Sequence, residues 1–155
     1  MRGTTWLVCD VSGSMLEAGK RFVVRTLVRE VEQYFRLGYA TEKDIKLLAW
    51  NNELEVLPWS PGDEVPTNLL QCRGSADIEA LLTFFHNHPD DKFIVLSDGF
   101  WADDSQAALT RWKSQGNRDA LRILKVGADA NLRLKGSEVF KAEDLFAALD
   151  GWLGK

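Results

Sequence analysis

Residues 5–14 read TWLVCDVSGS, and the change from apolar to polar residues within this stretch is the first indication of the fold. The first five residues are uncharged and mostly apolar or β-branched, and they predict a buried β-strand over residues 5–9. Asp10 ends the apolar run, and small and polar residues follow it. Functional side chains are often found where a strand ends and a polar loop begins, as here.

Downstream, short apolar runs alternate with segments of helical periodicity, which is the pattern of an α/β domain. Further strands are expected at residues 45–50, 54–57, 93–96, 120–126 and 139–140, and helices at residues 20–37, 77–86, 105–114 and 142–153. Asn51-Asn52 gives a two-residue turn, so the strand after it should pair antiparallel at a sheet edge. The predicted fold class is a three-layer, Rossmann-like α/β fold. Its open sheet is mostly parallel with one antiparallel edge strand, and helices cover both faces.

Composition limits the classes of protein that this chain can represent. Its 155 residues suit one domain with its own core, and we expect a single domain over residues 1–155. The formal net charge is −4 without a basic run, so no nucleic-acid partner is expected.

No apolar run is long enough to span a membrane, and the N-terminal apolar stretch meets Asp10 too soon for a signal peptide. We therefore expect a cytoplasmic protein without a membrane partner. Cys9 and Cys72 are too few for a disulfide scaffold or a zinc cluster.

Side chains with oxygen atoms lie where several predicted elements begin or end. They are Asp10, Ser12 and Ser14 after the first strand, Ser75 before the second helix and Asp98 after the fourth strand. In an open parallel sheet, ligands bind beyond the carboxyl ends of the strands, at the point where the strand order reverses. If the first and fourth strands are neighbours, Asp10 and Asp98 meet at that point.

These residue types suit a hard divalent cation, Mg²⁺ first and Mn²⁺ second. The serines offer neutral hydroxyl oxygens, and the two aspartates offer carboxylates, directly or through water. Gly13 is expected to let the loop turn tightly, so that Ser12 and Ser14 point to one place. A cation held mostly by neutral oxygens keeps residual positive charge. It can therefore accept one more carboxylate from a partner.

Three short patterns carry a resemblance to a known family. They are Asp10-x-Ser12-x-Ser14, Gly74-Ser75 before the second helix, and Asp98-Gly99 after an apolar strand. Together they resemble the von Willebrand factor A (vWA) domain, and the order of strands and helices fits that family over essentially the whole chain. The resemblance implies a metal-ion-dependent adhesion site (MIDAS) made by the five oxygen-bearing residues. The family usually has threonine where Ser75 stands, and serine lacks the methyl group that limits rotation.

The resemblance also implies a function. It points to a non-enzymatic protein–protein interaction module whose metal binds an Asp or Glu of a partner. Intracellular bacterial proteins that resemble this family often work beside AAA+ ATPases or in kinase–phosphatase stress and defence systems, which implies an adaptor or regulatory subunit. Met15, Leu16, Phe100 and Trp101 flank the site and are candidate partner contacts. The alternative for the two aromatic residues is that both fold inward as loop anchors.

Other interpretations of the same residues stay open. Asp10 could form a strand-end turn, and Ser75 could cap the second helix. A magnesium-dependent, phosphatase-like hydrolase would also place its nucleophile at Asp10, but it needs an acidic residue two positions later, where Ser12 stands. Ser-His-Asp catalysis lacks the usual Gly-x-Ser-x-Gly turn. His86 and His88 are better explained as a solvated helix end than as metal ligands. The metal site could also be vestigial, with binding through another face.

Overall fold

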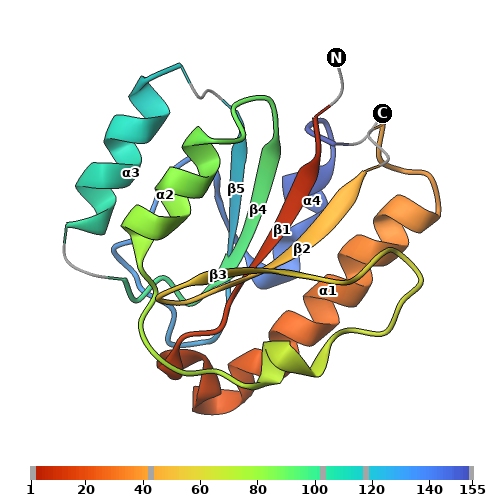
Figure 1. The fold of residues 1–155 in the computed structure, drawn as a ribbon, viewed down its shortest axis with the longest axis horizontal. Coiled ribbons are helices and arrows are strands. Elements are labelled where there is room, and N and C mark those ends of the chain that lie inside the picture. The colour runs from red at the N-terminus through yellow and green to blue at the C-terminus, as the bar shows by residue number, and fades with distance from the viewer. Residues whose placement is uncertain (1–2, 42–43, 102–103, 117–118, 154–155) are drawn as a thin grey trace.

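The computed structural model describes residues 3–41, 44–101, 104–116 and 119–153. Its strands are β1 (Thr5–Asp10), β2 (Ile45–Trp50), β3 (Leu54–Leu57), β4 (Lys92–Ser97), β5 (Leu121–Lys125) and β6 (Val139–Lys141). They form one six-stranded sheet in the order β3-β2-β1-β4-β5-β6 (Figure 1). Neighbouring strands are parallel except for β2 and β3, which pair antiparallel at one edge. The predicted sheet is confirmed.

Helices cover both faces of this sheet, as predicted. They are α1 (Lys20–Arg36), α2 (Ile78–His86), α3 (Ser105–Ser114) and α4 (Leu145–Leu149), with 3₁₀ helices η1 (Gly13–Gly19), η2 (Thr67–Leu70) and η3 (Ala142–Asp144). One face carries α1 and α4, and the other carries α2 and α3 (Figure 1). Side chains of β1 alternate between the two cores because successive strand residues point to opposite faces. Leu7 and Cys9 belong to the first core, whereas Trp6 and Val8 belong to the second.

The C-terminal segment differs from the helix expected over residues 142–153. Its first turn is the 3₁₀ helix η3, and α4 ends after Leu149. The backbone becomes extended at Asp150 and left-handed at Gly151, where φ is +77°. Asp150 accepts a hydrogen bond from the hydroxyl of Tyr34 at 2.9 Å, which holds this turn against α1. Leu153 is nevertheless buried, so the apolar pattern here marks burial and not a continuous helix.

The strand order reverses between β1 and β4. The chain leaves β1 towards α1 on one face and leaves β4 towards α3 on the other (Figure 1). Because the two connections diverge, the carboxyl ends of these neighbouring strands form a natural binding position. Asp10 is the last residue of β1, and Asp98 directly follows β4. The expectation that the first and fourth strands are neighbours is confirmed.

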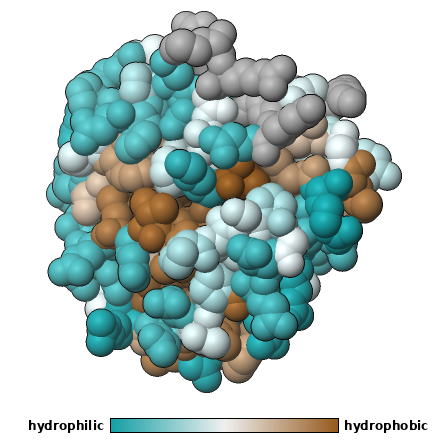
Figure 2. Space-filling model, turned by 45° about the vertical axis from the view of Figure 1, so that its right-hand side comes forward, coloured by the Kyte–Doolittle hydropathy of each residue, from teal (hydrophilic) through white to brown (hydrophobic). Residues whose placement is uncertain are grey.

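Apolar side chains also reach the surface, where Figure 2 shows them among hydrophilic groups on one face. The large exposed ones are Leu16, Phe22, Val23, Leu37, Tyr39, Val56, Phe100, Leu132 and Phe146. Two of these, Leu16 and Phe100, follow the carboxyl ends of β1 and β4. Within the described ranges, no helix is long and apolar enough to cross a bilayer.

Candidate functional site

Asp10 is almost completely buried, with 1% of its surface exposed. Its Oδ1 accepts a hydrogen bond from the backbone N–H of Ser12 at 2.8 Å, and its Oδ2 accepts one from the hydroxyl of Ser97 at 2.6 Å. Burial raises the pKa of Asp10, and these hydrogen bonds counteract it only in part. The charge of Asp98 raises the pKa of Asp10 further. A cation beside these two carboxylates would relieve both effects.

Two backbone hydrogen bonds join the loop after β1 to the segment before α2. The N–H of Arg73 donates to the carbonyl of Val11 at 2.7 Å, and the N–H of Gly13 donates to the carbonyl of Gly74 at 2.8 Å. This pairing fixes two segments that are about sixty residues apart in sequence. It therefore brings the loop that carries Ser75 against the loop after β1.

Ser12 and Ser14 lie on either side of the residue that starts η1. Their hydroxyl oxygens are 3.5 Å apart; Ser12 is buried and Ser14 is half-buried. Gly13 does not adopt a positive φ, and a β-carbon there would make an ordinary contact with the carbonyl of Gly74 at 3.5 Å. The tight turn therefore does not depend on the conformational freedom of Gly13. The 3₁₀ geometry of η1 brings the two hydroxyls together.

Ser75 is exposed and is held by Asn52, which lies in the turn between β2 and β3. The backbone N–H of Ser75 donates to Oδ1 of Asn52 at 3.1 Å, and its hydroxyl accepts from Nδ2 at 3.3 Å. The preceding residue, Gly74, has a φ of +76°, which favours glycine. Asp77 itself caps α2 by accepting hydrogen bonds from two backbone N–H groups of the first turn. The alternative that Ser75 caps this helix is therefore wrong.

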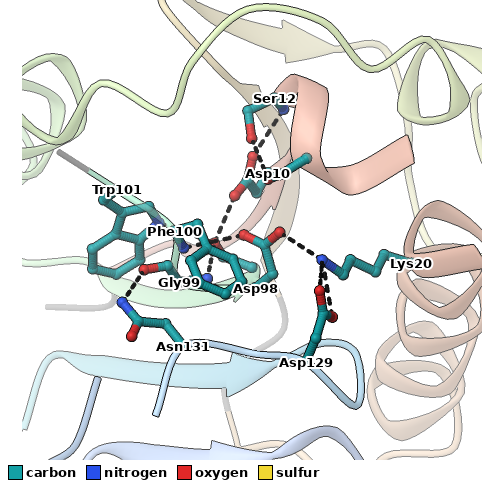
Figure 3. A network of polar contacts seen from close by, with 11 residues as sticks. Asp10, Ser12, Lys20, Asp98, Gly99, Phe100, Trp101, Asp129 and Asn131 are labelled. Atoms are coloured by element: carbon teal, nitrogen blue, oxygen red, sulfur yellow. Dashed lines mark hydrogen bonds and ion pairs between the residues drawn. The ribbon is translucent and has the colours of Figure 1, made fainter. Parts of the chain in front are cut away.

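Asp98 is fully buried, and its carboxylate is shared between its own loop and α1. Its Oδ1 accepts a hydrogen bond from the backbone N–H of Phe100 at 3.2 Å, and its Oδ2 accepts one from Nζ of Lys20 at 3.1 Å. Its backbone carbonyl accepts from the N–H of Asn131 at 2.9 Å. Figure 3 shows this carboxylate in one polar network with Asp10 and Lys20.

Sequence reasoning misses Lys20 and Asp129, which belong to the same network. Lys20 is the first residue of α1 and is fully buried, and its ammonium group lies 3.1 Å from the carboxylates of both Asp98 and Asp129. Burial lowers the pKa of Lys20, but hydrogen bonds and charges from the two aspartates outweigh it, and the net direction is upward. A lysine in the first turn opposes the helix dipole, and that signal could have revealed its need for an acidic partner.

Ser97 is also missed, although it connects the two halves of the site. Its hydroxyl donates to Asp10 and accepts from the backbone N–H of Gly99 and from Nε1 of Trp101, both at 3.0 Å. The ring of Trp101 meets that of Trp50 edge to face at a centroid distance of 5.7 Å. Trp101 therefore folds inward as a loop anchor, which was one of the two alternatives for it.

Only two of the four residues predicted to flank the site, Leu16 and Phe100, are exposed at its rim. Met15 has no exposed surface and packs in the core under α1, because η1 turns its side chain inward. Its predicted contact with a partner is therefore wrong. Leu16 and Phe100 are each 47% exposed and remain available as apolar surface. They come from the loops after β1 and β4.

The donor atoms fit a hard cation by type. Each carboxylate oxygen of Asp10 and Asp98 accepts one hydrogen bond, so each retains capacity for another contact. In the part of the chain that the structure describes, no three His, Cys, Asp or Glu side chains gather into a metal cluster. A cation at this position would therefore depend on the serine hydroxyls, which suits Mg²⁺ or Mn²⁺ better than softer metals.

Comparison of the sequence with family models and with curated proteins gives no match. The structure has a vWA-type, Rossmann-like α/β fold, and solved structures share it. The manganese-loaded TRAP protein of Plasmodium vivax matches over 99% of this chain and 74% of its own, with a TM-score of 0.64 and 11% identity.

Two further structures match less of their own length. Proximal thread matrix protein 1 from the mussel byssus, with a zinc-occupied MIDAS motif, matches over 99% of this chain and 47% of its own, with a TM-score of 0.55 and 13% identity. The RO (RSR) protein of Deinococcus radiodurans matches over 96% of this chain and 34% of its own, with a TM-score of 0.54 and 18% identity. The chain thus spans less than half of these two proteins. At such identities the likeness establishes the fold alone.

Proposed function

We propose that this chain is a protein–protein interaction module that binds an acidic side chain of a partner through a divalent cation. The cation ligands are Asp10, Ser12, Ser14, Ser75 and Asp98. The observation that supports this proposal is that two buried carboxylates, Asp10 and Asp98, lie at the strand-order reversal. The Ser12 and Ser14 hydroxyls follow in the loop after β1, and backbone hydrogen bonds join that loop to the segment that precedes Ser75. Strand-end positions of this kind are the usual ligand sites of open α/β sheets.

Two solved structures of the same fold support a divalent cation. One is described as manganese-loaded, and the other has a zinc-occupied MIDAS motif. The donor set here contains oxygen atoms alone, and Mg²⁺ is the abundant hard cation that such a set would take, with Mn²⁺ as a close substitute. Because three of the five ligands are neutral hydroxyls, the bound cation would keep positive charge for a partner carboxylate.

The partner surface follows from the exposed rim. Leu16 and Phe100 lie beside the ligands on the two loops, each about half exposed. A partner would place an Asp or Glu side chain on the cation and apolar neighbours against these two residues. The vWA resemblance suggests a bacterial AAA+ ATPase, a kinase or a phosphatase as partner, with this chain as adaptor or regulatory subunit in a cytoplasmic stress or defence assembly.

A hydrolase that uses Asp10 as nucleophile is less compatible with the geometry. Both oxygens of Asp10 accept hydrogen bonds, and the residue is 1% exposed, so a substrate phosphorus atom has no clear approach. Residue 12, which would supply the general acid, is a serine. We therefore propose a non-enzymatic role.

Calorimetric titration with Mg²⁺ and Mn²⁺ tests the metal site. We expect saturable binding by the wild type and its loss in Asp10→Ala and Ser12→Ala. Matched controls are Asp90→Ala and Ser114→Ala, which replace residues away from the carboxyl ends of β1 and β4. Absence of heat and of a thermal shift with the wild type would refute the metal site.

Partner recognition is tested with the immobilised protein. Partners should bind in Mg²⁺, elute with EDTA and fail to bind Asp10→Ala and Ser12→Ala. Partners that remain in EDTA and on both site variants would mean that recognition uses another face.

A further inference from the structure

Lys20 occupies a position where an unpaired lysine would be strongly unfavourable. It is the first residue of α1, where the helix dipole repels a positive charge, and its side chain has no exposed surface. Its ammonium group is nevertheless held at 3.1 Å by two carboxylates (Figure 3). One, Asp98, is a fully buried proposed ligand; the other, Asp129, has 57% of its side chain exposed.

The surroundings of Lys20 are fitted to its side chain. Gly127, in the loop after β5, has a φ of +99°, and a β-carbon there would lie 2.8 Å from Cε of Lys20. Nζ also lies 5.5 Å from the centroid of the Phe100 ring, within reach of a cation–π contact. The lysine thus touches a proposed ligand, a neighbouring loop and an exposed rim residue at once.

We propose that Lys20 is a built-in competitor for the divalent cation, and that Asp129 is the alternative partner that receives its ammonium group when the cation binds. This inference rests on the proposed function, because it concerns the same site. Without a cation, Lys20 supplies the positive charge that the buried Asp98 needs. A divalent cation beside Asp98 repels the ammonium group, and Asp129 is already in contact to take it.

The arrangement makes metal affinity depend on both partners of Lys20, in opposite directions. Replacing Lys20 by a neutral side chain leaves Asp98 free for the cation, so binding should strengthen. Replacing Asp129 by asparagine removes the alternative partner and leaves the ammonium group on Asp98, so binding should weaken. A purely structural role for Lys20 predicts no such reversal of sign.

The test is calorimetric titration of the full chain with Mn²⁺ and with Mg²⁺. Lys20→Met should bind on the order of tenfold more tightly than the wild type, and Asp129→Asn on the order of tenfold more weakly. Lys113→Met and Asp119→Asn are matched controls, because each breaks another ion pair of the described chain, with Glu138 and Arg122 respectively. Both controls should keep wild-type affinity.

The outcomes separate this inference from the proposed function. If the wild type binds metal while Lys20→Met binds equally or more weakly, and Asp129→Asn is unchanged or tighter, the competitor role is refuted and the metal site stands. If Lys20→Met binds and the wild type does not, the competitor role is supported in its strongest form. If neither the wild type nor any variant binds, both fail. Should Lys20→Met not fold, the weaker binding of Asp129→Asn against Asp119→Asn decides alone.

Discussion

The hydroxyl of Ser97 donates a hydrogen bond to Oδ2 of Asp10 at 2.6 Å, across the two central strands of the sheet. The same hydroxyl oxygen accepts from Gly99 and Trp101, so its single proton is committed to Asp10. This contact aligns the carboxylate of Asp10 with the loop that carries Asp98. It also makes Ser97 a determinant of stability.

Ser97→Ala should lower the free energy of unfolding by about 2 kcal/mol, because it removes a hydrogen bond to a buried carboxylate and leaves two donors without an acceptor. Urea unfolding monitored by tryptophan fluorescence measures this. Ser105→Ala is the matched control: Ser105 is also buried, but its hydroxyl makes no hydrogen bond with any described residue. A control that is destabilised as much as Ser97→Ala would show that the hydrogen bonds of Ser97 are not the cause.

Gly74→Ala should destabilise the chain by about 2–3 kcal/mol and weaken metal binding. A β-carbon at Gly74 meets Oδ1 of Asn52, the group that holds Ser75, and φ is +76°. Gly62→Ala isolates the backbone effect, because φ is +99° there and no atom lies within 4 Å of the added carbon. It should cost only about 1 kcal/mol and leave metal binding unchanged. Equal metal affinity in both variants would mean that Ser75 does not contribute.

Met15 and Leu16 are adjacent but should respond in opposite ways. Met15→Ala removes a fully buried side chain and should lower the free energy of unfolding by about 2–4 kcal/mol. Leu16→Ala should change it by less than about 0.5 kcal/mol, because the side chain is 47% exposed, but should weaken partner capture. Chemical unfolding and pull-down measure the two effects. Normal partner capture by Leu16→Ala would remove it from the proposed surface.

Stability should fall at alkaline pH because of Tyr34. Burial, and then the hydrogen bond to Asp150 and its charge, raise the pKa of Tyr34 from 10.0 to about 12. The folded state therefore holds this proton more tightly than the unfolded state. The resulting stability is fully present below pH 10 and is lost as the pH rises towards 12.

Urea unfolding at a series of pH values between 8 and 12 measures this loss. Tyr34→Phe should flatten the curve, whereas Tyr39→Phe, which leaves Tyr34 and Asp150 intact, should keep it. A wild-type curve that matches that of Tyr34→Phe would contradict the prediction.

The fold could be predicted from sequence because its signals are local. Short apolar runs such as residues 93–96, bounded by polar loops, favour buried strands, and the short polar connection after residue 50 favours an antiparallel edge. In the structure that connection has three residues, 51–53, because Trp50 pairs with Leu54, so the predicted two-residue turn is wrong while the antiparallel pairing is confirmed. The length of the C-terminal helix was overestimated, because the periodicity of residues 142–153 indicates burial and not a continuous helix. The end of the helix is determined by the left-handed Gly151 and by the contact of Asp150 with Tyr34.

The site was predictable only where its residues follow strands. Asp10 and Asp98 could be placed together by the rule for open sheets, whereas the three residues that connect the network could not. These residues act through contacts between distant parts of the sequence. Lys20 is 78 residues from Asp98 and 109 residues from Asp129. Ser97 is 87 residues from Asp10. Met15 was misplaced because an apolar residue after a polar loop looks the same whether η1 turns it outward or inward.

Met15 and Trp101 also lie on opposite sides of the sheet. Met15 belongs to the core beneath α1 and α4, while Trp101 packs against the core beneath α2 and α3. A cation and a partner carboxylate bound between their two loops would link the two helical layers to each other across the end of the sheet. Occupancy of the cation site should therefore slow amide hydrogen exchange in the helices on both faces of the sheet. A bound partner should have the same effect on both faces.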